Sequence, residues 1–307
     1  MKTVELVIAS LRRSAILIGK NIWLLGWAFL YAFTAPLFML GGTGLPVLFW
    51  WLGGRYFEPT LLFSDPLAFI LGHMSLILFA LAGFTVGFVL YLLVMLFYYG
   101  ALTGVAARGF APGNIGAEKV RASTFFEEGA RMFSPGLTSI ALVSLLPLLP
   151  MAVLLLLVVV ISFKLAALVS GTLDISTPWV LICIVLTGIS GFLTLLTSWI
   201  AFLWYKFSIA ASRVENLDGR AATGRAWSFF KARWKLVVCY VVALLLLAVL
   251  SWGVTAPFSM GGKMLDGVMK PLGVALQIVA VPLGVVLTLF IDLWTRCALV
   301  ALFIDNR

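Results

Sequence analysis

Charged residues are scarce in this chain. Of its 307 residues, 63% are hydrophobic and only 11% are charged, whereas a soluble domain needs roughly 25% charged residues. Two windows, 132–163 and 236–262, contain no charged residue at all. Windows of that length can cross the ~30 Å hydrocarbon core of a bilayer as helices. The composition therefore excludes a soluble domain and predicts an integral membrane protein.

The side chains that most enzymes and metal sites depend on are also few. The chain has one histidine, His73, and its three cysteines (Cys183, Cys239 and Cys297) lie within apolar stretches, with no CxxC spacing. The glycine-rich 41–44 lacks the lysine of a phosphate-binding loop. We therefore expect no catalytic residues, no cofactor and no metal site, and we expect His73 to form hydrogen bonds at a membrane interface.

The apolar stretches predict an all-α fold in which residues 1–307 form a single membrane domain. Residues 45–51 are too short to span a bilayer, so we expect them to re-enter it or to lie at its surface. Pro147 and Pro150 are expected to kink the third span. The six predicted spans are 22–40, 75–105, 138–163, 179–206, 236–258 and 272–302.

Basic residues are distributed unequally between the two sides of these spans. Seventeen lysines and arginines fall on the side of both termini, and four fall on the other side. The positive-inside rule then places both termini in the cytoplasm, consistent with six spans. Because the basic residues form short clusters between spans, they do not predict binding to nucleic acid.

A threefold pattern runs along the chain. Each odd-numbered span follows a short amphipathic segment, and the ends of the even spans resemble one another. We predict three units (4–108, 123–213 and 222–303), each made of an amphipathic cytoplasmic helix and a helical hairpin. In the first such helix, one face is expected to carry Val4, Val7, Ile8, Leu11, Ala15 and Ile18.

The basic residues of the amphipathic helices can have either of two roles. They either contact anionic lipid or a partner at the inner leaflet, or pack against the bundle and set its topology. The candidate contacts are Arg12, Arg13, Lys20, Arg225, Lys231, Arg233 and Lys235.

The last span contains the clearest polar pair of the sequence. Asp292 and Arg296 are four residues apart and share a helix face, and Lys206 occupies a corresponding position in the fourth span. Such charges could line or gate a polar pathway, bind an anionic headgroup, or form a structural salt bridge. Carboxylates such as Glu128 are expected in solvated connections.

Residues 215–247 resemble a loop and span of a group of bacterial six-helix membrane proteins. The shared features are Ala226-Trp227, the basic stretch from Lys231 to Arg233, and Trp234. The group includes the YciC-like proteins and the membrane domain fused to some glycerophosphodiester phosphodiesterases. The resemblance implies a multi-pass protein of the bacterial inner membrane. The soluble phosphodiesterase domain has no counterpart in this chain, so no active-site residues are carried over.

These features predict a non-catalytic membrane protein that acts as a scaffold, assembly factor or accessory subunit. Its expected partners are membrane lipids, anionic ones at the cytoplasmic face, together with a protein complex or further copies of the chain. The alternative is a transporter or channel, in which the charged pair of the sixth span would take part.

Overall fold

The computed structural model describes residues 2–52, 72–110, 117–169, 178–266 and 269–306, and the regular structure within these ranges is helical. The helices are α1 (Lys2–Lys20), α2 (Trp23–Leu52), α5 (Met74–Gly109), α6 (Ser123–Val143), α7 (Leu145–Val169), α8 (Pro178–Glu215), α9 (Gly219–Ala232), α10 (Trp234–Asp266) and α11 (Lys270–Asn306).

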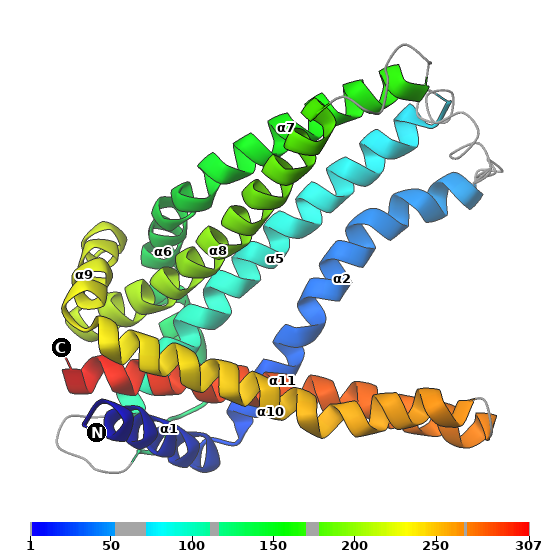
Figure 1. Ribbon diagram of the computed structural model, residues 1–307. Coiled ribbons are helices and arrows are strands. Elements are labelled where there is room, and N and C mark those ends of the chain that lie inside the picture. The colour runs from blue at the N-terminus through cyan, green and yellow to red at the C-terminus, as the bar shows by residue number, and fades with distance from the viewer. Residues whose placement is uncertain (1, 53–71, 111–116, 170–177, 267–268, 307) are drawn as a thin grey trace.

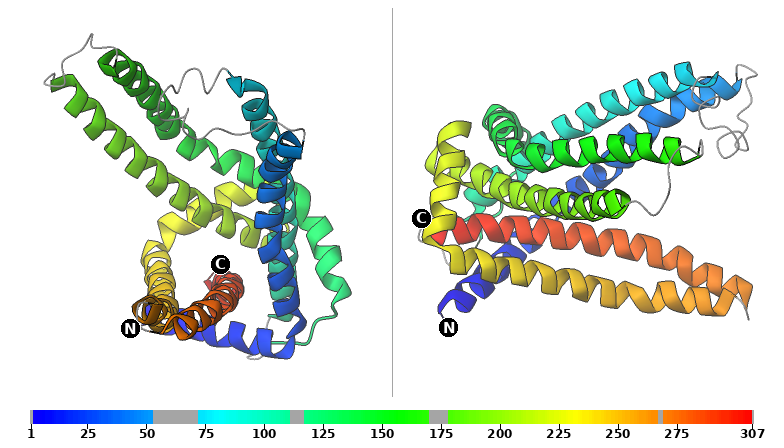
Figure 2. Two further views of the ribbon diagram at one scale, coloured as in Figure 1. Left: turned by 90° about the vertical axis from the view of Figure 1, so that its right-hand side faces the viewer. Right: turned by 45° about the horizontal axis from the view of Figure 1, so that its top comes forward.

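The long helices pair into three hairpins, α2 with α5, α7 with α8, and α10 with α11. We call these hairpins the arms. The arms diverge from a common base, at which both ends of the chain lie (Figure 1; Figure 2). We call this base the hub, and define it as α1, α6 and α9 together with residues 95–109, 201–215 and 293–306.

The hydrophobic core is concentrated in the hub. Its fully buried large side chains include Phe207, Phe229 and Phe303, contributed by α8, α9 and α11. Further out, the arms expose long rows of leucine, valine and phenylalanine. An apolar surface of this length is stable only when lipid or another membrane segment covers it.

Within the described ranges, five helices are long and apolar enough to cross a membrane, and α6 with α7 supplies a sixth span if the bent pair is counted as one. The two helices meet at Ser144 with a bend of 44°. Pro147 explains the break, because it has no N–H for the carbonyl of Val143 and its ring crowds that group. The predicted kink in this span is therefore confirmed. The long apolar helices confirm the helical membrane class.

The expectation that residues 45–51 re-enter the membrane as a separate segment was wrong, because these residues continue α2 without a break. The preceding glycines form a helix contact instead. A Cβ atom at Gly42 would collide with the carbonyl oxygen of Gly83 on α5, and a Cβ at Gly83 would collide with that of Gly42. Small residues at such crossings let two membrane helices approach closely.

The amphipathic helices link the arms in a ring. Helix α6 packs on α5, α9 packs on α8, and α1 packs on α11, so that the first helix of the chain closes on the last. The predicted face of α1 was only partly right. Val7 and Ile18 are buried, but Val4 and Ile8 are exposed, and the buried face also holds Ser14. The Ser14 hydroxyl donates to the Leu11 carbonyl (2.7 Å), which satisfies it within the helix.

Candidate functional site: charged residues where the arms leave the hub

Asp292 and Arg296 form the predicted pair on α11. The Nε atom of Arg296 donates to Oδ2 of Asp292 over 2.6 Å. The arginine side chain is 9% exposed and that of Asp292 is 32% exposed, so the carboxylate lies at the edge of the cluster. The i, i+4 spacing predicts a charge-assisted hydrogen bond between two residues one helical turn apart, as found here.

Lys206 of α8 completes the cluster, as its position in the fourth span suggested. Its Nζ atom lies 3.9 Å from Oδ1 of Asp292 and 4.5 Å from the centre of the Phe202 ring. The cluster therefore contains two cations and one carboxylate. Helix α5 contributes Tyr99, whose ring centre is 3.3 Å from the guanidinium carbon of Arg296. Stacking on an aromatic face suits a weakly hydrated guanidinium.

Tyr99 connects the cluster to a row of tyrosines between α2 and α5, which the sequence analysis missed. The Tyr31 hydroxyl donates to that of Tyr99 (3.4 Å) and bonds with that of Tyr91 (3.0 Å). Tyr31 also stacks on Tyr98, with ring centres 4.3 Å apart. The tyrosines at 31, 91, 98 and 99 were the sequence signal for this row. Their side chains come into contact only because of the way α2 and α5 pack.

A cavity of about 20 Å³ lies within the cluster, between α5, α8 and α11. Its polar lining comes from Tyr99, Lys206, Arg296 and Thr103. A space of this size holds about one water-sized group.

A second set of charges connects α1, α6 and α9 to the second helix of each arm. We call these second helices, α5, α8 and α11, the return helices. Glu128 of α6 is fully buried, contrary to the expectation of a solvated carboxylate. It accepts hydrogen bonds from Nε of Arg108 (2.7 Å) and from Nε and Nη2 of Arg213 (2.6 and 3.0 Å). One side chain thereby joins α5, α6 and α8.

Two further ion pairs complete this set. Arg225 of α9 donates to Glu215 of α8 (2.9 and 3.0 Å), and these hydrogen bonds raise the pKa of Arg225. Arg13 of α1 donates to Asp305 of α11 (2.7 and 2.8 Å) and lies over the Phe110 ring.

The structure divides the predicted inner-leaflet residues into two groups. Arg13 and Arg225 form ion pairs within the hub, and the exposed Lys20 donates to the Ala117 carbonyl (2.7 Å), so these three have partners within the protein. The other group consists of Arg12, Lys231, Arg233 and Lys235, which are exposed. Lys231 and Lys235 lie over the rings of Trp227 and Trp234, at 5.6 and 5.8 Å.

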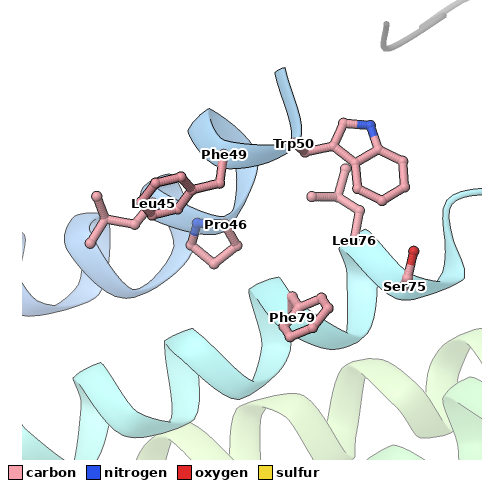
Figure 3. Close-up of a pocket in the computed structure, with 7 residues that line it drawn as sticks. All are labelled: Leu45, Pro46, Phe49, Trp50, Ser75, Leu76 and Phe79. Carbon is pink, nitrogen blue, oxygen red and sulfur yellow. The ribbon is translucent and has the colours of Figure 1, made fainter. Parts of the chain in front are cut away.

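The outer end of the α2/α5 arm has an apolar pocket of about 570 Å³ (Figure 3). Its lining includes Phe49, Trp50, Leu76 and Phe79, with Ser75 as a polar member. His73 lies at the start of α5, with its ring centre 6.1 Å from that of Trp50. Among the described residues, no group of three His, Cys, Asp or Glu side chains is arranged to hold a metal ion.

The fold and the charged cluster define a multi-pass helical membrane protein. Comparison with protein-family models, with curated proteins and with solved structures found no match.

Proposed function

We propose that the protein is a non-catalytic membrane scaffold or accessory subunit, which acts through lipid and protein contacts. The observation that carries this proposal is the contrast within each arm. The inner parts of the arms are packed into the hub, while Leu246, Trp252 and other outer residues remain exposed. Because the apolar arms separate beyond the hub, their surfaces can contact lipids and membrane segments of other chains.

The three predicted units, 4–108, 123–213 and 222–303, are part of the proposal. Three residues support them: Tyr99, Lys206 and Arg296 meet at the cluster from the three return helices. Nine residues further along, at 108, 215 and 305, each return helix carries a charge, namely Arg108, Glu215 and Asp305.

Each of these three charges pairs with the amphipathic helix that packs on its own return helix. The partners are Glu128, Arg225 and Arg13, in that order. The first unit has the opposite polarity, with the arginine on the return helix. Three related units predict the same pair position in each unit. The acidic and basic residues can exchange places, because the attraction depends only on opposite signs.

We further propose that the hub faces the cytoplasm of a bacterial inner membrane, in agreement with the six-helix group that the sequence resembles. The exposed basic residues of the hub support this orientation. In a variant without native cysteines, Ser228→Cys on α9 should react with a membrane-impermeant maleimide only after permeabilisation. Met264→Cys, at the other end of α10, should react in intact cells. The reverse pattern would contradict the orientation.

Site-specific photocrosslinking tests the scaffold role. A photoreactive residue at Leu246 on an arm is compared with one at Ser228 in the hub, followed by extraction into lipid nanodiscs and mass spectrometry. We expect Leu246 to form stoichiometric crosslinks with one defined protein or with a second copy. A protein that remains monomeric, without partners and indifferent to lipid composition, would contradict the proposal.

A transporter or channel is the second candidate, and the charged cluster with its row of tyrosines favours it. Intramembrane charges often mark substrate pathways. Flux of ions and small solutes into liposomes, with Asp292→Asn as the control, tests this alternative. Flux that depends on Asp292 would favour transport, and absence of flux for every solute class would count against it.

A further inference from the structure

Lys206 is a mostly buried lysine whose ammonium group has no hydrogen-bond acceptor within the described part of the chain. Its side chain is 10% exposed, and it donates no hydrogen bond to any described residue. The nearest carboxylate oxygen, Oδ1 of Asp292, is 3.9 Å away, too far for a hydrogen bond. Asp292 is engaged at 2.6 Å with Arg296. A mostly buried ammonium without an acceptor is unfavourable, and its nitrogen is not closed off within the described residues, so an additional acceptor can reach it.

The net charge of the cluster indicates what kind of acceptor fits. Two cations face one carboxylate, which leaves an excess positive charge among the described residues. The cavity of about 20 Å³ that Lys206 lines has room for one small group, such as one oxygen of a phosphate. An anionic oxygen would satisfy both the missing acceptor and the missing negative charge.

The face of α8 that carries Lys206 continues outward as an apolar stripe. Phe202, Trp199 and Leu195 follow at helical spacing, and all three are exposed. From Leu195 to Lys206 the stripe is about 16 Å long at the helical rise. This is about the thickness of one leaflet of the ~30 Å hydrocarbon core. A ligand that matches the whole face has one anionic end and one apolar chain.

Tryptophans mark the depth of the cluster in the bilayer. Trp204 and Trp294 precede Lys206 and Arg296 by two residues, and Trp234 begins α10. Because tryptophan gathers at the headgroup level of membranes, Lys206 lies within reach of lipid phosphates.

We propose that Lys206 binds the phosphate of an anionic phospholipid whose acyl chain lies along Phe202, Trp199 and Leu195. The inference rests on the lipid-contacting role proposed above and specifies the site and lipid class. A headgroup without its own cation is favoured because the cluster has excess positive charge. Arg296 lines the same cavity and adds to its positive potential.

Native mass spectrometry of the delipidated full chain, titrated with phosphatidylglycerol or phosphatidylcholine, tests the site. Lys206→Gln is expected to weaken phosphatidylglycerol binding about tenfold, which corresponds to one charge-assisted hydrogen bond. Lys206→Arg should retain the preference. The matched control is Lys119→Gln, which removes an exposed lysine from the connection before α6 and should leave affinity unchanged.

Three outcomes would overturn the site. Unchanged affinity in Lys206→Gln would mean that the cavity holds only water. An equal loss in Lys119→Gln would mean general attraction to the basic surface. Displacement of phosphatidylglycerol by inorganic phosphate at equal concentration would mean that the site takes a free anion and that the apolar stripe contributes nothing. A protein partner crosslinked at Leu246 would support the scaffold role under any of these results.

Discussion

The hub and the arms are built from the same helices but are stabilised in different ways. Tyr205, Phe207 and Leu102 are buried in the hub, and ion pairs connect its helices. One turn or two further out, the same helices expose phenylalanine and leucine. Lipid is as apolar as these side chains, so the arms gain little by packing on one another. Polar bonds and close-packed small residues therefore stabilise the helix contacts. The ion pairs lie in the hub, whereas the Gly42–Gly83 contact lies in the first arm.

The buried carboxylate of Glu128 should show the largest effect. Glu128→Ala removes the three hydrogen bonds that this buried carboxylate accepts from Arg108 and Arg213, a loss of about 3 kcal/mol. We expect a large drop in the thermal unfolding midpoint in detergent. The neighbouring Glu127→Ala is the matched control, because Glu127 is mostly exposed and lies 3.5 Å from Arg108. Equal loss in both variants would contradict the importance of the buried network.

The glycine crossing of the first arm should show an intermediate effect. Gly42→Leu places a side chain where the backbone of Gly83 lies, and overpacking costs about 1–3 kcal/mol. Gly41→Leu is the control, because a Cβ atom there has nothing within 4 Å. Disulfide trapping between cysteines in the outer parts of α2 and α5 should fail only in Gly42→Leu. Unchanged trapping in Gly42→Leu would argue against the crossing.

The ion pair that closes the ring should show the smallest effect. Arg13 and Asp305 are partly exposed, so their coupling is expected to be about 1 kcal/mol or less. Arg13→Asp and Asp305→Arg should each destabilise the hub, and the double variant should restore much of the loss. A double-mutant cycle of unfolding free energies measures this coupling. A cycle with no coupling would remove the support that this pair gives to three related units.

Sequence patterns predicted the apolar spans and the spacing of the Asp292–Arg296 pair, because each depends on spacing within one segment. They failed where the outcome depends on a distant partner. The glycines at 41–44 suggested an interruption, but Gly83 on another helix makes Gly42 a contact. Glu128 was expected in solvent, and two arginines from different helices hold it in the hub.

Labelling with a lipid-soluble carbene reagent, mapped by mass spectrometry, tests the division between hub and arms most directly. The account predicts strong labelling of the outer stripe at Leu195, Trp199 and Phe202, and protection of Tyr205, Phe207 and Leu102 a few residues away. Protection of both sets would show that the arms close on one another in the membrane, and would contradict a structure joined through its hub.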